Sequence, residues 1–92
     1  MDRSDLLSFL KRSKANNVTE LDLSNKDIHE IPDEIGELHA LKILNLSYNN
    51  IKEVPTSICN LTSLEKLFLT RNQITRMPSG IGNLVKLKII MN

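Results

Sequence analysis

The chain repeats itself with a period of 23 residues. Complete blocks of that length begin at Val18, Leu41 and Leu64, and a partial block begins at Leu87. The blocks span residues 18–40, 41–63, 64–86 and 87–92. Self-similarity at a fixed period predicts a solenoid, in which each repeat covers the apolar face of its neighbour. Most apolar side chains therefore serve a core, and functional residues are sought where the repeats differ.

The first half of each block predicts a short strand. Apolar residues occupy its fourth and sixth positions and variable residues lie between them, which indicates one buried face. Equivalent residues should then line up on adjacent strands. The fourth position holds Leu21, Leu44, Leu67 and Ile90. The sixth position holds Leu23, Leu46 and Leu69.

The consensus of the complete blocks is LxxLxLxxNxLxxLPxxIxxLxx. This pattern resembles the leucine-rich repeats. The 23-residue period, with Pro at position 15 and Ile at position 18, resembles the Ras-group subclass of intracellular members. The resemblance covers residues 18–91. It implies an α/β fold, a right-handed leucine-rich-repeat solenoid of strands and helical or 3₁₀ turns, with a parallel sheet on the concave side.

The ninth position has a structural explanation. A buried Asn amide satisfies backbone N–H and C=O groups that a sharp turn leaves unpaired. We expect Asn49 and Asn72 to act in this way. In the first repeat Lys26 takes this position, which predicts a looser first turn.

The second half of each block predicts a short helix or 3₁₀ turn on the convex side. Position 15 is always proline, which fixes φ and removes a hydrogen-bond donor. The next position holds good N-cap residues, namely Asp33, Thr56 and Ser79. Position 19 holds the small residues Gly36, Cys59 and Gly82. Small residues there predict that neighbouring turns approach closely.

The two ends of the array differ. Residues 1–17 predict a helical cap for the N-terminal end of the core, with a helix over 4–15 that Ser4 can N-cap. Its apolar face consists of Leu6, Leu7 and Leu10. The partial fourth repeat has no such cover, and Asn92 stands where a core leucine is expected. This open end predicts either a longer array or a homodimer joined through the C-terminal ends.

Composition argues against several partner classes. Lys and Arg number 12 and Asp and Glu 11, so a net charge of +1 favours neither nucleic acid nor membrane. Cys59 is the single cysteine, which excludes an internal disulfide. With no signal-peptide pattern and no membrane-span pattern, we expect a soluble cytoplasmic protein. On that basis the glycosylation sequons at Asn17, Asn45 and Asn60 are expected to be unused.

Charge is unevenly distributed along the repeats. The first repeat has seven acidic residues against Lys26, whereas residues 41–92 have two acidic and seven basic residues. A solvated surface with no binding role explains this unevenness, because exposed charges interact weakly and are screened by salt. The alternative is a polarised surface that orients a partner or directs contacts between copies.

The outward strand positions predict a protein-binding surface. In this architecture positions 3, 5 and 7 face the concave side, and position 8 lies at the rim. Apolar and aromatic side chains beside a basic residue are typical of an interface core, although single surface apolar residues are normal. The candidate partner-binding residues are Ile43, Asn45, Tyr48, Lys66, Phe68, Arg71, Ile89 and Met91.

No residue constellation indicates catalysis, a cofactor or a metal site. His29 and His39 fall on different sides of the coil without a helical partner, and Cys59 lacks an orienting third group. The acidic residues of the first repeat lack the spacing of a calcium loop. We therefore predict a non-catalytic protein-interaction module. The resemblance implies a small GTPase or a signalling scaffold as partner, by analogy alone. The alternative is a structural, self-associating array.

Overall fold

The computed structural model describes residues 1–91, which form one α-helix followed by four coils. The helix α1 spans Arg3–Ala15. The coils are numbered 1 to 4 by their strands, which are β1 (Glu20–Asp22), β2 (Ile43–Asn45), β3 (Lys66–Phe68) and β4 (Lys88–Ile90). Coils 1 to 3 each add a 3₁₀ turn, which are η1 (Asp33–Glu37), η2 (Thr56–Asn60) and η3 (Ser79–Asn83).

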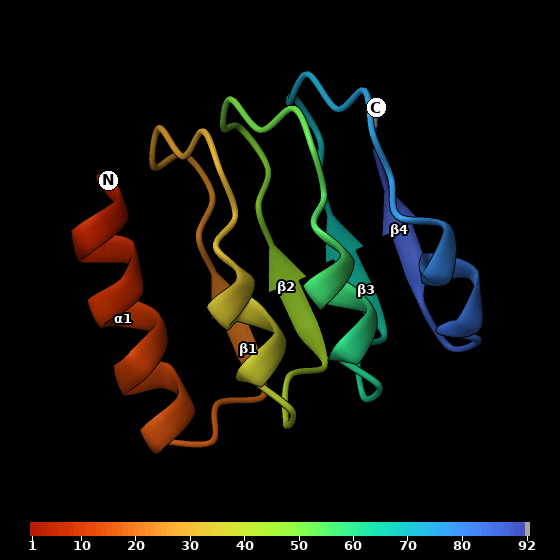
Figure 1. Ribbon diagram of the computed structural model, residues 1–92, viewed down its shortest axis with the longest axis horizontal. Helices are drawn as coiled ribbons and strands as arrows, with labels where there is room; N and C mark the ends of the chain where they lie inside the picture. Colours follow the sequence, from red (N-terminus) through yellow and green to blue (C-terminus); the bar gives the residue numbers. More distant parts are fainter. Residues whose placement is uncertain (92) are drawn as a thin grey trace.

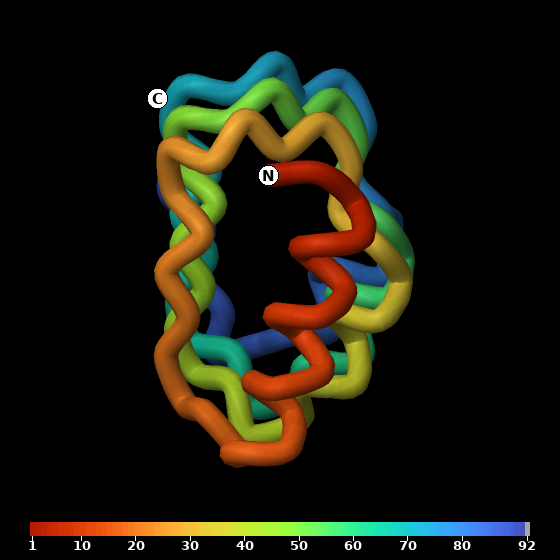
Figure 2. Tube along the Cα trace, turned by 90° about the vertical axis from the view of Figure 1, so that its left-hand side faces the viewer, coloured from red at the N-terminus to blue at the C-terminus, as the bar shows by residue number. Residues whose placement is uncertain are grey.

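The strands form one parallel sheet in chain order. Figure 1 shows them side by side behind the row of 3₁₀ turns. Seen along the array in Figure 2, the coils superimpose as an oval, with the strands on one long side and the 3₁₀ turns and α1 on the other. This arrangement confirms the predicted solenoid.

The core fills the space between the sheet and the 3₁₀ turns. Leu44 is fully buried and pairs with Leu21 on one side and with fully buried Leu67 on the other. The sixth-position leucines are also buried. Burial of apolar surface at about 25 cal/mol per Å² is the main favourable term in folding. The predicted role of the fourth and sixth positions in coils 1 to 3 is therefore confirmed.

Coil 4 differs from the prediction by one residue. Leu67 pairs with Ile89, not with Ile90, so Ile90 lies beside Phe68. Ile89 packs against the core. In the expected register the sixth position falls on polar Asn92, whereas the shifted register brings Met91 to the hollow beside Leu69. Met91 is still 46% exposed there, but an apolar side chain beside the core is favoured over a polar one, which gives the shift its physical reason.

The predicted scaffold role of Asn49 and Asn72 is confirmed. The Oδ1 atom of Asn49 accepts hydrogen bonds from the backbone N–H groups of Lys26 at 3.1 Å and Ile28 at 2.9 Å. Its Nδ2 donates to the carbonyls of Leu23 at 3.0 Å and Leu46 at 2.9 Å. Each Asn thus holds the turn of the preceding coil.

The predicted looseness of the first turn was wrong. The turn of coil 1 receives its hydrogen bonds from Asn49 of coil 2, so Lys26 at the ninth position does not deprive it of them. The N-terminal ammonium of Met1 also donates to the carbonyl of Lys26. Lys26 is tolerated because an Asn in coil 1 would have no preceding coil to hold.

The 3₁₀ turns lie in the second half of each block, as predicted, and start directly after its proline, but they are not capped as predicted. Pro32, Pro55 and Pro78 occupy the N-cap positions, and no side chain caps any of these turns. The predicted N-cap role of Asp33, Thr56 and Ser79 was therefore wrong, because each is the first residue inside its turn. A short 3₁₀ turn after a fixed proline φ forms without a side-chain cap.

A small residue at position 19 is sterically required at Gly36 but not at Gly82. A Cβ atom at Gly36 would lie 2.7 Å from the carbonyl oxygen of Ser57. At Gly82 nothing lies within 4 Å of such an atom. The predicted close approach is confirmed between η1 and η2, and Gly82 makes no comparable contact among the described residues.

Helix α1 lies beside η1, on the convex side of the sheet (Figures 1 and 2). It buries Leu6 and Leu10 in the same core cluster as Leu21. The carboxylate of Asp2 accepts a hydrogen bond from the backbone N–H of Asp5 at 2.8 Å, so Asp2 caps the helix. Ser4 lies inside the helix, and its predicted N-cap role was wrong.

Candidate protein-binding surface

The concave face consists of the first and third residues of each strand, because the central residue packs into the core. Successive side chains in a strand point to opposite faces, so these residues point away from the core. In order from β1 to β4 they are Glu20 and Asp22, Ile43 and Asn45, Lys66 and Phe68, and Lys88 and Ile90. The face is acidic on β1 and basic on β3 and β4.

Three half-buried apolar side chains on this face form what we call the apolar patch: Ile43, Phe68 and Ile90. Phe68 pairs directly with Ile90 across β3 and β4. None of the three packs against the core, whereas the neighbouring Ile89 does. Ile43 pairs with Lys66 and lies diagonal to Phe68. Diagonal neighbours are about 7–8 Å apart, which an aromatic side chain can span, so Phe68 links the three residues into one patch.

The charged residues of the concave face are exposed. Lys66 pairs with Lys88 across β3 and β4, while Glu20 and Asp22 lie on β1. The carboxylate of Asp22 accepts hydrogen bonds from the hydroxyl of Ser24 at 2.6 Å and from its backbone N–H at 2.9 Å. These bonds, the hydroxyl first, lower the pKa of Asp22 below its ordinary value of 3.8. Asp22 therefore keeps its charge in mildly acidic solution.

Three residues at position 8 line the rim in left-handed backbone conformation. Their φ angles are 55° at Asn25, 59° at Tyr48 and 58° at Arg71. Asn adopts this conformation at low cost, whereas bulky side chains do so rarely. Tyr48 is nevertheless 59% exposed, so burial does not compensate for the strain. Strained, exposed residues of this kind are concentrated at functional sites.

The predicted site residues divide into two groups. Ile43, Asn45, Lys66 and Phe68 do meet on the concave face, with Tyr48 and Arg71 at its rim. The placement of Ile89 and Met91 on that face was wrong, because the register of coil 4 directs Ile89 to the core and Met91 to a hollow beside Leu69 and Ile74. Lys88 and Ile90 take the concave positions that had been expected for coil 4.

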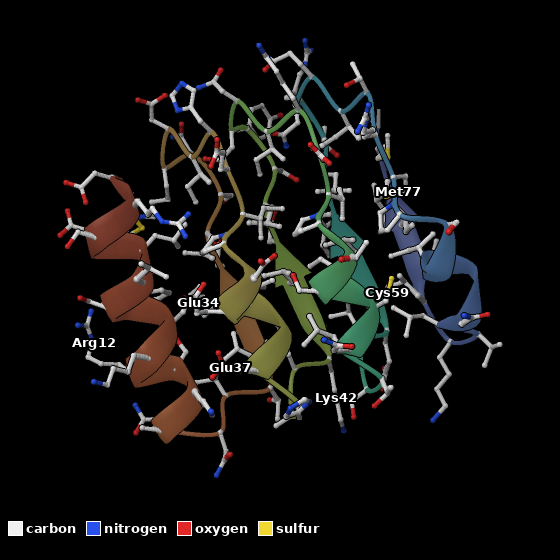
Figure 3. All side chains as sticks on the ribbon, viewed as in Figure 1. Arg12, Glu34, Glu37, Lys42, Cys59 and Met77 are labelled. Carbon is white, nitrogen blue, oxygen red and sulfur yellow. The ribbon has the colours of Figure 1, made fainter. Side chains whose placement is uncertain are left out.

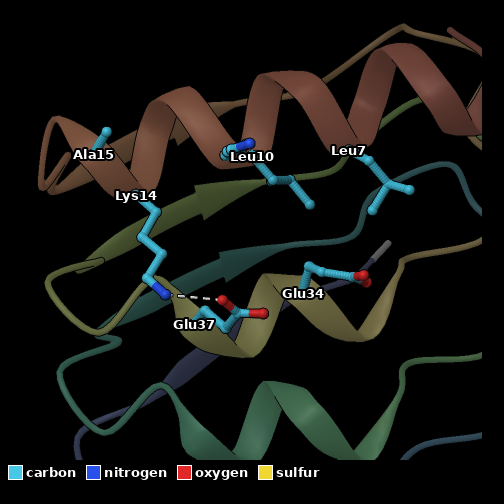
Figure 4. A pocket seen from close by; sticks show the side chains of 7 residues that line it. Leu7, Leu10, Lys14, Ala15, Glu34 and Glu37 are labelled. Atoms are coloured by element: carbon cyan, nitrogen blue, oxygen red, sulfur yellow. Dashed lines mark hydrogen bonds and ion pairs between the residues drawn. The ribbon is translucent and has the colours of Figure 1, made fainter.

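A second hollow lies on the convex side between α1 and η1, and sequence reasoning did not predict it (Figure 4). Its volume is about 630 Å³. Lys14 and Glu37 form an ion pair of 2.9 Å across it. The residues that line it are Leu7, Leu10, Lys11, Lys14, Ala15, Glu34 and Glu37. The α-helix is wider than a 3₁₀ turn, so α1 packs against η1 with space left between them. The repeat pattern does not include α1 and therefore could not predict this space.

The residues with reactive side chains are dispersed. Cys59 lies half-buried on η2 (Figure 3), where a Cβ atom added to Gly80 would lie 3.3 Å from its Sγ. His29 is exposed, and its ring Nδ1 lies 3.2 Å from the carbonyl oxygen of Asp27. Within residues 1–91 no three His, Cys, Asp or Glu side chains are grouped so as to hold a metal ion. No helix in the same range is long and apolar enough to cross a membrane.

Comparison with known proteins settles the family. The model of the leucine-rich repeat region matches residues 16–92. The chain belongs to the leucine-rich-repeat family. This membership confirms the resemblance to leucine-rich repeats, and repeat arrays of this kind use an extended concave surface for binding. No curated protein matches the sequence.

Two solved structures show the same architecture. A leucine-rich-repeat protein of Leptospira interrogans is 34% identical, with a TM-score of 0.75 over 79% of this chain and 19% of that protein. A TDR receptor is 36% identical, with a TM-score of 0.72 over 92% of this chain and 16% of the receptor. The chain thus spans less than a fifth of the length of each.

Proposed function

We propose that this chain is a non-catalytic module that binds a protein partner on its concave face. The observation that carries the proposal is the apolar patch of Ile43, Phe68 and Ile90, which is contiguous and does not pack against the core. Contiguous apolar surface on a folded protein marks interaction sites. Basic residues beside the patch and Tyr48 at the rim complete the composition of an interface core.

The resemblance to Ras-group repeats directs the choice of partners to test. Small GTPases and signalling scaffolds are the first candidates, by family analogy. The chain spans less than a fifth of its solved relatives, so a partner of the whole relative need not contact this region. The partner is therefore one that contacts the concave face of these coils themselves.

Phe68→Ala tests the proposal. Peptide binders are first selected from an unbiased display library against the wild-type chain, and their affinities for the variant are then measured. We expect a loss of about tenfold or more, because truncating a central aromatic residue of an interface costs about 1–2 kcal/mol or more. Phe68 does not pack against the core, so we expect the melting temperature to change little.

Val85→Ala is the matched control. Val85 is 90% exposed and lies between η3 and β4, away from the concave face. Val85→Ala should leave the affinity of the selected peptides unchanged. Binders that tolerate Phe68→Ala as well as Val85→Ala would contradict the proposal, and unfolding of the Phe68→Ala protein would show that Phe68 serves the fold.

A second candidate function, self-association through the C-terminal side of the array, has its own observation. Residues on the C-terminal side are half-buried where the equivalent residues one repeat earlier are buried. The half-buried set is Met77, Ile81, Leu84 and Leu87, and its buried equivalents are Val54, Ile58, Leu61 and Leu64. Met77 is visible at this end in Figure 3. A following coil in a longer array or a second copy would cover this surface.

Sedimentation velocity across micromolar concentrations tests self-association. If a second copy covers the C-terminal side, the chain should sediment as a dimer, and Ile81→Glu should convert it to a monomer. Glu34→Lys, on the far side of the array, is the control. A monomer at every concentration would rule out the homodimer and leave the concave-face proposal unaffected.

A further inference from the structure

We infer that the occupant of the concave face is an acidic segment that carries an apolar side chain and lies over β3 and β4. The inference rests on the proposed function and adds the chemistry of the partner. It follows from the placement of two lysines, the apolar patch and two carboxylates on one sheet surface.

Lys66 and Lys88 place two positive charges side by side on the concave face. They pair directly across β3 and β4, and both side chains are exposed. Like charges on directly opposite residues of neighbouring strands repel each other. In the part of the chain that the structure describes, the ion pair is Lys14–Glu37, so neither concave lysine has an anionic partner there. An anion above β3 and β4 would relieve this repulsion.

Part of the apolar patch lies on the same two strands as these lysines. Phe68 lies two residues after Lys66 on the same face of β3, and its pairing partner Ile90 lies two residues after Lys88. The two lysines and the two apolar side chains therefore form adjacent rows on the same pair of strands. An occupant that places an apolar side chain on Phe68 and Ile90 brings its neighbouring residues over the lysines.

The acidic residues of the concave face lie too far from the lysines to neutralise them. Glu20 and Asp22 lie on β1, two strand spacings from β3 and three from β4, or roughly 10 and 14 Å. These distances exceed the screening length of about 8 Å at physiological ionic strength. The carboxylates therefore do not neutralise the lysines. They repel an acidic occupant from β1 and so fix its position over β3 and β4.

The hollow between α1 and η1 lacks this imbalance of charge. Two lysines and two glutamates line it, and Lys14 already pairs with Glu37 (Figure 4). An acidic segment gains less there, because it must displace an existing carboxylate. The concave face is therefore the surface that selects for acidic chemistry.

Three synthetic peptides test the inference by titration into ¹⁵N-labelled protein. The first has one Phe flanked by Glu and Asp residues, the second has Lys and Arg in place of the acids, and the third keeps the acids and replaces Phe with Gly. We expect the first to bind at least about tenfold more tightly than the other two. Its amide shifts should concentrate on β3 and β4, and added salt should weaken it.

Charge reversal provides the decisive variants. The double substitution Lys66→Glu and Lys88→Glu should reverse the preference so that the basic peptide binds more tightly. Lys52→Glu, an exposed lysine outside the strands, is the matched control and should leave the preference unchanged. A dispersed amide spectrum verifies folding, and Lys66→Gln with Lys88→Gln is the milder replacement if the reversed pair unfolds.

Several outcomes would overturn the inference. They are equal binding of the basic peptide, shifts centred on the hollow between α1 and η1, and concentration-dependent shifts on β3 and β4 without peptide, which would show a second copy on this face. Library-selected binders that need Phe68 but lack acidic residues would overturn the inference and leave the concave-face proposal intact.

Discussion

At the scale of single residues, Asn49 links two coils through one side chain. It is 4% exposed, and its amide bonds backbone groups on both sides of the boundary between coils 1 and 2. Asn72 repeats the arrangement one coil later, donating to Leu46 at 2.9 Å and accepting from Ile51 at 3.0 Å. Buried polar groups of the turns are thus satisfied within the protein, as folded structures require.

Asn49→Ala should be strongly destabilising. The substitution leaves the N–H groups of Lys26 and Ile28 and the carbonyl of Leu23 without partners, whereas the carbonyl of Leu46 keeps its hydrogen bond from Asn72. Each group left unpaired costs about 1–3 kcal/mol. We expect a loss of at least about 2 kcal/mol in urea unfolding. Asn50→Ala is the adjacent control, because Asn50 makes one exposed hydrogen bond to Asp27 at 2.7 Å. Equal losses in the two variants would contradict the assigned role.

Asp22 should make a small contribution to stability that depends on pH. Hydrogen bonds from Ser24 favour the charged carboxylate, so the pKa of Asp22 in the folded state lies below 3.8. The contribution is present above 3.8 and is lost as the pH falls through the lowered folded-state pKa. Ser24→Ala keeps the backbone hydrogen bond and should raise the pKa part of the way to its ordinary value.

An NMR titration of the Asp22 carboxyl carbon measures this pKa directly. Ser47→Ala is the control, because Ser47 lies at the equivalent place in coil 2, where its backbone N–H donates to the Oδ1 of the neutral amide of Asn45. It should not change the titration of Asp22. An unchanged pKa in Ser24→Ala would contradict the assigned role of the hydroxyl group.

At the scale of the elements, the spacing of the 3₁₀ turns depends on what lies beside position 19. Gly36 is buried against Ser57 of the next turn, with no room for a methyl group. Gly82 has the same position in coil 3 and open space around it. Identical residues at equivalent positions thus carry different structural constraints.

Gly36→Ala should destabilise the protein by about 1–3 kcal/mol, the usual cost of an overpacked site. The added Cβ would meet a backbone oxygen, which cannot move aside as a flexible side chain can. Gly82→Ala should be neutral or slightly stabilising, because it reduces the entropy of the unfolded chain without a clash. Thermal melts of the two variants measure the difference, and similar melts would contradict the assignment.

The elements also show what the sequence could predict. The 23-residue period and the alternation of apolar residues predicted the strands, the core leucines and the Asn positions of coils 1 to 3. Three full blocks give three aligned examples of each position, which fixes the register of their strands. Coil 4 supplies only six residues, and its consecutive Ile89 and Ile90 fit an alternating pattern in either register. The identity of the concave residues of β4 therefore required coordinates, as did the hollow between α1 and η1.

At the scale of the whole molecule, local stability should differ between coils. The backbone N–H of Ile28 bonds Asn49, and that of Ile51 bonds Asn72. The equivalent N–H of Ile74 has no such partner among the described residues. Coil 3 is also the coil whose convex residues are half-buried. Both observations place the least protected turn at the C-terminal side.

Hydrogen exchange should reveal this gradient. We expect the amide of Ile74 to exchange faster than those of Ile28 and Ile51, on the order of fivefold or more for one missing hydrogen bond. Asn72→Ala should accelerate exchange at Ile51 and leave Ile28 comparatively protected. Uniform exchange at the three isoleucines would contradict the gradient.

The direction of the Asn hydrogen bonds has a consequence for building on this scaffold. Each amide secures the turn that comes earlier in the chain, so a unit appended after coil 3 with its own Asn would strengthen a turn already present. A unit placed ahead of coil 1 would meet Lys26, which offers no amide. Lengthening the scaffold on that side therefore requires Lys26→Asn and the displacement of α1, which covers coil 1. Growth after coil 3 replaces the shifted coil 4 and leaves coils 1 to 3 unchanged.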